Sequence, residues 1–159
     1  VLAPFLRNGY LHSNIREKGG AYGGGASFDS NIAAFKFFSY RDPNCQATFE
    51  HFKNSIDWLL ENNHDDEKLT EAIMGIISGM DKPGSPAGEA VKSCFANLHG
   101  RTKAWQQSLR EQILSVTIDD LKRVASLYLK DKTPARAVIA PIEQEQAIAE
   151  LGFDIKKLT

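Results

Sequence analysis

Apolar residues recur every three or four positions across the first eighteen residues, which is the spacing of an amphipathic helix. Pro4 falls in the first turn, where its missing N–H removes no hydrogen bond, and Gly19 and Gly20 end the helix. Two runs typical of strands follow at residues 21–29 and 31–42. The first is rich in glycine, and the second has apolar residues in both of its alternating sets of positions. The short polar spacer between them predicts a β-hairpin.

Helical spacing returns after the hairpin. Asp42 is expected to be the N-cap and Pro43 the first residue of a helix whose apolar face includes Phe49. Thr117 and Asp120 form a pattern like a capping box, which predicts another helix start. Helices are further predicted over residues 69–80, 90–98, 105–113, 121–128 and 143–151.

A short apolar strand is predicted at residues 135–140, and Pro141 ends it. The order helix, hairpin, several helices, strand, helix favours an α+β fold, in which helices pack on one face of a mainly antiparallel sheet. Three strands make a thin sheet for this many helices. Residue 1 is Val and already lies in the first predicted helix, so we expect residues 1–159 to form a single domain that is part of something larger.

Composition narrows the classes of partner. The chain has 42% hydrophobic and 25% charged residues, and 19 basic against 20 acidic side chains give a net charge of −1. Because no basic field results, binding to nucleic acid or to an anionic membrane is disfavoured. No apolar run approaches the ~20 residues that span a bilayer. Cys45 and Cys94 lie far apart without a C-x-x-C motif, so we predict no disulfide framework and expect both thiols to be buried.

The common cofactor motifs do not occur in the sequence. The glycine-rich run at residues 19–25 lacks the Lys of a Walker phosphate loop, and it follows a helix, whereas a dinucleotide fingerprint follows a strand. No two histidines lie within four residues of each other, as a zinc site on one helix would need; they are His12, His51, His64 and His99. Glu50 and His51 would complete an inverted zinc motif, H-x-x-E-H, only if Ala47 were His. We therefore predict no metal ligands and no cofactor within this chain.

The glycine-rich run has two interpretations, and the residues leave both open. Glycines end a helix and let a strand approach another part of the backbone closely. Alternatively, a strand without side chains leaves room for a substrate chain to lie alongside. In that case the candidate substrate-binding residues are Gly20, Gly23, Gly24 and Gly25.

Arg16 and Tyr22 are the candidate catalytic residues, because they bracket the change of chain direction at Gly19 and Gly20. An Arg is a fixed cation whose planar donors suit a carboxylate or a carbonyl oxygen, and a Tyr hydroxyl can donate to a developing oxyanion. Both side chains are expected to point into one cleft. An ordinary surface Arg and an ordinary strand Tyr would explain the same residues.

Three segments of the chain carry a resemblance to a known family. They are residues 8–12 (NGYLH), 15–26 (IREKGGAYGGGA) and 38–44 (FSYRDPN). Together they closely resemble the C-terminal part of the pitrilysin/insulinase family of zinc metallopeptidases, and most of all its presequence-protease-like branch. Residues 115–128 and 135–141 are also similar to the final helix and strand of a family half-domain, so the resemblance covers most of the chain.

The resemblance implies a division of labour between two halves of a clamshell. The N-terminal half of such peptidases binds zinc on H-x-x-E-H and a distal Glu. The C-terminal half closes over the peptide and supplies an Arg and a Tyr, which correspond to Arg16 and Tyr22. Because the zinc motif and the first strands of the half-domain do not occur in residues 1–159, we expect a C-terminal fragment with a truncated sheet, inactive alone and with an exposed sheet edge open to self-association.

Two functions follow from the resemblance. The first is the substrate-enclosing end of a zinc metalloendopeptidase that degrades unstructured peptides, with zinc held outside this chain. The alternative is a non-catalytic interaction or scaffold subunit of the same fold. The sequence preceding Val1 discriminates between them, since H-x-x-E-H there indicates an enzyme. The compartment stays open.

Overall fold

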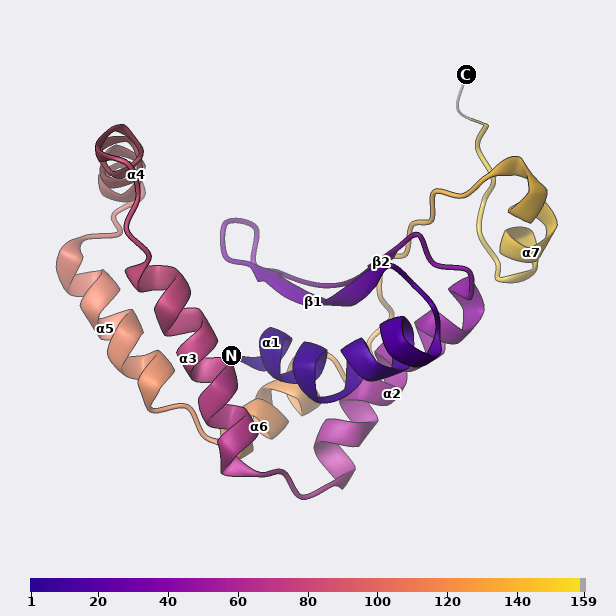
Figure 1. Ribbon diagram of the computed structural model, residues 1–159, viewed down its shortest axis with the longest axis horizontal. Helices are drawn as coiled ribbons and strands as arrows, with labels where there is room; N and C mark the ends of the chain where they lie inside the picture. The colour runs from indigo at the N-terminus through magenta and orange to yellow at the C-terminus, as the bar shows by residue number, and fades with distance from the viewer. Residues whose placement is uncertain (158–159) are drawn as a thin grey trace.

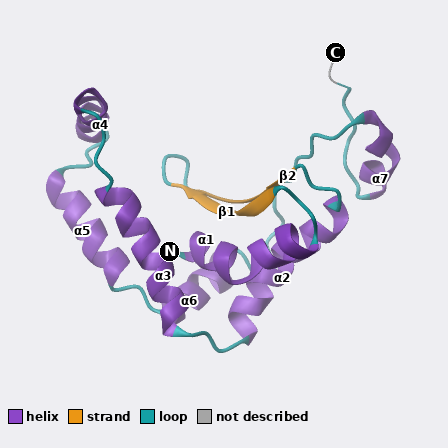
Figure 2. Cartoon of the chain, in the orientation of Figure 1, coloured by secondary structure: helices purple, strands orange, loops and turns teal. Residues whose placement is uncertain are grey.

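A computed structural model describes residues 1–157 (Figures 1 and 2). The elements run in the order α1 (Leu2–Leu6), η1 (Arg7–Lys18), β1 (Gly23–Asp29), β2 (Ala34–Tyr40), α2 (Cys45–Glu61), α3 (Asp66–Asp81), α4 (Pro86–Leu98), α5 (Lys103–Leu114), α6 (Ile118–Tyr128), η2 (Ile142–Gln144) and α7 (Glu145–Glu150). This is the α+β class that the sequence predicts. No helix within residues 1–157 is both long and apolar enough to cross a membrane.

The first helix changes character along its length. α1 continues directly into η1, a segment of wider π-helical turns. η1 ends at Lys18, next to the predicted stop at Gly19 and Gly20. Two hydrogen bonds satisfy carbonyl groups at this end: the N–H of Gly20 donates to Arg16 O at 3.1 Å, and the N–H of Ala21 donates to Ile15 O at 3.1 Å. Gly20 has φ +76°, a left-handed conformation that residues with a side chain rarely adopt. The chain therefore reverses within three residues of the helix end.

The predicted hairpin is confirmed. β1 pairs with β2 in antiparallel register from Gly23 opposite Tyr40 to Asp29 opposite Ala34. Helices α1, η1 and α2 lie beneath this hairpin, and no helix within residues 1–157 covers its other face (Figure 1). Helices on one face of an antiparallel sheet are what the element order predicts.

One hydrophobic core joins the N-terminal helix to the hairpin and to three later helices. Its fully buried side chains come first from α1 and η1, and α2, α3 and α6 pack against them. The core includes Phe5, Leu6, Leu11, Ile15, Ala26, Leu59, Leu69, Ile73, Ile77, Leu121 and Ala125. Helices α4 and α5 bury no side chain completely, so they stand at the margin of this core (Figure 1).

The predicted strand at residues 135–140 is wrong. These residues belong to no helix or strand, and the Ile139 side chain is 90% exposed. A strand is stable only when a neighbour satisfies its N–H and C=O groups. Within residues 1–157 the sheet has two strands, and neither pairs with this segment.

The start of α2 also differs from the prediction. Its N-cap is Asn44 rather than Asp42, and Pro43 precedes the helix. The Asp42 carboxylate instead accepts hydrogen bonds from Asn44 N at 2.8 Å and Thr48 Oγ1 at 2.6 Å. Asp42 therefore stabilises the turn that leads into the helix.

The expectation that both cysteines are buried is wrong. Cys45 is half-buried, and burial raises the pKa of its thiol. Cys94 is exposed, in keeping with α4, which buries no side chain completely. The expected capping box is confirmed at Thr117 and Asp120, where hydrogen bonds from Thr117 lower the pKa of the Asp120 carboxyl.

We predict that Gly24→Ala lowers the free energy of unfolding by about 1–3 kcal/mol, because overpacking has this cost. An added Cβ would lie 2.8 Å from Cγ2 of Ile15, a fully buried side chain with no room to move. Urea unfolding followed by circular dichroism measures the change.

Gly75→Ala is the matched control, since Gly75 lies in α3 with nothing within 4 Å of an added Cβ. Ala should stabilise that helix by roughly 0.5–1 kcal/mol. Equal stability of the Gly24 variant and the original chain would show that the hairpin does not rest tightly on η1.

Candidate functional site

The candidate site lies at the junction between the end of η1 and the start of β1. Two hydrogen bonds hold the link between them, residues 19–22, to neighbouring elements. Asn44 Nδ2 donates to Gly19 O at 2.6 Å, and Tyr22 N donates to Arg41 O at 3.2 Å. The first contact holds the link to the start of α2, and the second holds it to the end of β2. Arg16 and Tyr22 therefore sit on a fixed turn of the backbone.

Arg16 lies in the last turn of η1 with an exposed side chain. Its Nη1 is 3.5 Å from Nε2 of His12, and Nδ1 of His12 is 3.5 Å from Oε1 of Glu17. A guanidinium only donates, so this contact requires Nε2 of His12 to accept, and a neutral ring would then carry its proton on Nδ1, facing Glu17. Within residues 1–157 no carboxylate lies within 4 Å of the Arg16 guanidinium, which leaves this cation without an ion-pair partner in the described part of the chain.

Tyr22 lies just before β1 with 59% of its surface exposed. Its ring centroid is 5.5 Å from that of Tyr40, and the guanidinium carbon of Arg41 is 5.2 Å from the Tyr22 centroid. No hydrogen bond is made by the Tyr22 hydroxyl within residues 1–157. The ring therefore has neighbours while its hydroxyl stays available as a donor.

The prediction that Arg16 and Tyr22 point into one cleft remains a prediction. Both side chains are exposed and lie on either side of the left-handed Gly20. No hydrogen bond or ring contact joins them in the described residues. In the structure the Arg16 side chain contacts His12, and the Tyr22 ring contacts Tyr40 and Arg41.

The structure supports the close-approach interpretation of the glycine-rich run. A Cβ added at Gly24 would overlap Ile15, one at Gly25 would overlap the Arg7 side chain, and one at Gly23 would overlap the Tyr40 ring. Gly20 differs, since its requirement is the left-handed φ. The same four glycines as substrate-binding residues remain a prediction.

Sequence reasoning missed Tyr40 and Arg41 as neighbours of Tyr22. They are eighteen and nineteen residues away along the chain, and only the register of the hairpin places them beside it. The available signal was their presence in the FSYRDPN segment at residues 38–44.

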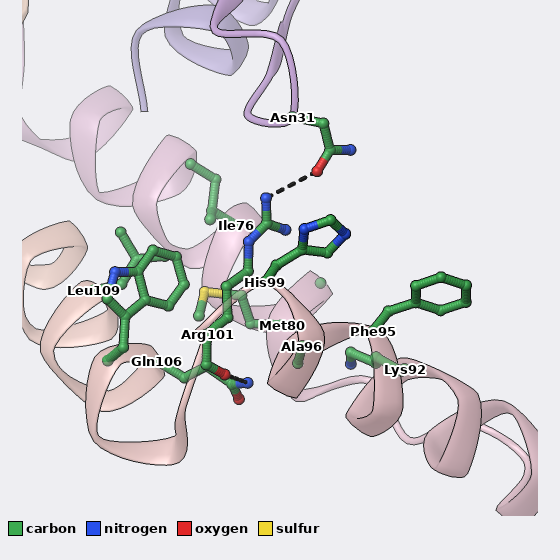
Figure 3. Close-up of a pocket in the computed structure, with 12 residues that line it drawn as sticks. Asn31, Ile76, Met80, Lys92, Phe95, Ala96, His99, Arg101, Gln106 and Leu109 are labelled. Atoms are coloured by element: carbon green, nitrogen blue, oxygen red, sulfur yellow. Dashed lines mark hydrogen bonds between the residues drawn. The ribbon is translucent and has the colours of Figure 1, made fainter.

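An open groove lies at the other end of the hairpin from Tyr22 (Figure 3). The Arg101 guanidinium donates to Asn31 Oδ1 at 2.8 Å, which joins the hairpin turn to the connection between α4 and α5. Met80, Phe95 and Lys92 line the same groove. This contact spans 70 residues of sequence and orients the hairpin against the marginal helices.

The residues that the structure describes do not fit a zinc site. Within residues 1–157, no three His, Cys, Asp or Glu side chains come together in a way that could hold a metal ion. A ring nitrogen of His64 lies 2.9 Å from Leu59 O, and the His51 ring faces Tyr10. The histidines therefore pack locally rather than converge.

The family comparison and the most similar relatives both relate this chain to presequence proteases. The family model described as the PreP C-terminal domain matches residues 1–143. A protein named "Presequence protease, mitochondrial" from Emericella nidulans is 39% identical over 159 residues, covering 100% of this chain and 15% of that protein. Proteins of the same name from Saccharomyces cerevisiae and Xenopus tropicalis are 38% and 37% identical, covering 99% and 89% of this chain. The chain spans only 14–16% of the length of these relatives.

We predict that His12, in its neutral form, carries its proton on Nδ1. The reason is that Arg16 can only donate to Nε2. Nitrogen-15 NMR of the imidazole distinguishes the two tautomers. His99, an exposed ring outside this cluster, is the reference. A proton found on Nε2 of His12 would rule out the contact with Arg16.

Proposed function

This chain belongs to the PreP C-terminal domain family, and we propose that it is the substrate-enclosing C-terminal domain of a zinc metalloendopeptidase that degrades unstructured peptides. The observation that carries the proposal is the match over residues 1–143, together with an exposed Arg16 and Tyr22 on either side of Gly20. The mitochondrial presequence proteases that it resembles are peptidases by name.

Arg16 is proposed to bind the peptide through a backbone carbonyl or a carboxylate. Its guanidinium has several donors, of which only one contacts His12 in the described residues. No carboxylate in the described residues lies within ion-pair distance of the Arg16 guanidinium to compensate its positive charge. A planar cation of this kind binds a carbonyl or carboxylate oxygen with two parallel hydrogen bonds.

Tyr22 is proposed to donate its hydroxyl proton in a hydrogen bond to the oxygen that becomes negative when the peptide bond is attacked. Such a donor stabilises the transition state most when it is already in place before the reaction. The short link from Gly19 to Tyr22, held at Asn44 and at Arg41, fixes the backbone on which the ring stands.

Zinc is proposed to lie outside this chain, in the N-terminal half of the same polypeptide. The residues described here do not fit a zinc site, and the relatives are more than six times as long as the chain. Bound there, the ion would supply the activated water for hydrolysis. Delivery of Arg16 and Tyr22 by closure of the two halves would complete the site only around an enclosed peptide.

The uncovered face of the hairpin is proposed to contact the rest of that polypeptide. Phe38 and Tyr40 are 41% and 51% exposed, and residues 135–140 are extended without a pairing strand. The sheet also has an exposed edge, and in the isolated chain we expect this edge to be open to pairing with a second copy. A scaffold subunit of this fold would use such surfaces as well, but it would not need an exposed Arg16 guanidinium that has no carboxylate partner in the described residues.

We predict that Arg16→Ala and Tyr22→Phe each lower kcat/KM of the full-length polypeptide by about ten- to a thousandfold, as loss of a transition-state donor does. Arg123→Ala and Tyr128→Phe are matched controls, because both side chains are exposed on α6. Cleavage of a fluorogenic unstructured peptide gives kcat and KM.

The isolated 159-residue chain is the negative control in the same assay, since we expect it to be inactive without the zinc-binding half. Zinc-dependent cleavage by this chain would contradict the division of labour between two halves. Unchanged kinetics in both the Arg16 and Tyr22 variants would contradict their assignment and favour the scaffold function.

A further inference from the structure

We propose that Arg41 is a positioning residue that holds the Tyr22 ring in its working orientation. The inference rests on the proposed function, in which the Tyr22 hydroxyl contacts the substrate. It adds a residue to that site that directly follows β2 and is not itself proposed to touch the substrate.

Arg41 reaches Tyr22 through both its backbone and its side chain. Its carbonyl oxygen accepts a hydrogen bond from Tyr22 N at 3.2 Å. Its guanidinium carbon lies 5.2 Å from the centroid of the Tyr22 ring, within the range of about 6 Å in which a cation is attracted to an aromatic face. One residue therefore fixes both where the Tyr22 backbone sits and which way its ring lies.

The backbone of Arg41 is strained. Its φ is +48°, in the left-handed region that glycine adopts without penalty and an Arg does not. Strain of this kind persists where the surrounding structure over-determines it, and it gathers at functional sites. Arg41 combines this strain with the contact between its guanidinium and the Tyr22 ring.

Tyr40 confines the ring from another direction. Its centroid is 5.5 Å from that of Tyr22, with the two planes inclined by 57°. Tyr40 pairs with Gly23 across the hairpin, and only a residue without Cβ at that position leaves space for the Tyr40 ring. Gly23, Tyr40 and Arg41 thus form one support for Tyr22, and the hydroxyl at the end of the ring stays uncovered.

This support matters because Tyr22 is otherwise poorly confined. With 59% of its surface exposed, the ring lacks the packing that normally fixes a rotamer. A donor that must be ordered at the moment of reaction contributes less to the rate than one already in place. Loss of Arg41 should therefore lower kcat and leave KM nearly unchanged.

The test compares Arg41→Gly with Arg41→Lys in the full-length polypeptide. Glycine removes the guanidinium while relieving the backbone strain, so the variant should keep its thermal stability. We expect kcat to fall by about 2- to 30-fold, the range of a cation–π contact, with KM within about twofold. Arg41→Lys, which keeps a cation, should recover part of kcat. Asp131→Gly is the matched control, because Asp131 also has a positive φ, +56°, and lies outside the hairpin.

A double-variant cycle with Tyr22→Phe separates the possible outcomes. If Arg41 acts through the Tyr22 hydroxyl, then Arg41→Gly should have no further effect in the Tyr22→Phe background. A full additional loss there, or an unchanged kcat for Arg41→Gly alone while Tyr22→Phe is impaired, would overturn the inference and leave the proposed function standing. An unimpaired Tyr22→Phe enzyme would remove the proposed role of Tyr22, and the role of Arg41 with it.

Discussion

The close approach between a glycine-rich strand and a helix is the constraint on which this structure depends. Gly24 lies against the buried Ile15 side chain, so β1 rests on η1 with no side chain of its own at this point. Because the two elements touch, a link of four residues, Gly19 to Tyr22, is enough to connect them, and Arg16 and Tyr22 lie close to its two ends. Any side chain that lifted the strand would also displace Tyr22 from the helix that carries Arg16.

A second constraint is that the described residues leave much apolar surface uncovered. The hairpin has helices on one face only, α4 buries no side chain, and Ile139 is 90% exposed. Large exposed apolar patches mark surfaces that contact another partner. The relatives are far longer than this chain, which supports the proposal that the remainder of the polypeptide provides the cover.

Features that depend on local physics could be predicted from the sequence. The capping box at Thr117 depends on side chains three residues apart, and the helix end at Gly20 depends on one backbone conformation. Features that depend on distant neighbours could not. Residues 135–140 have the composition of a strand, but no described strand pairs with them, and the contact of Arg41 with Tyr22 follows only from the hairpin register. Arg16 and Tyr22 could therefore be proposed from the sequence as site residues, while the neighbours that support Tyr22 could not.

The most direct test of the central claim is a structure of the full-length polypeptide, inactivated at its proposed zinc-binding half, with an uncleaved peptide bound. The account predicts that the Arg16 guanidinium and the Tyr22 hydroxyl both lie within hydrogen-bond distance, about 3 Å, of the peptide backbone at the bond to be cut. A peptide bound at the zinc with both side chains facing away from it would contradict the account.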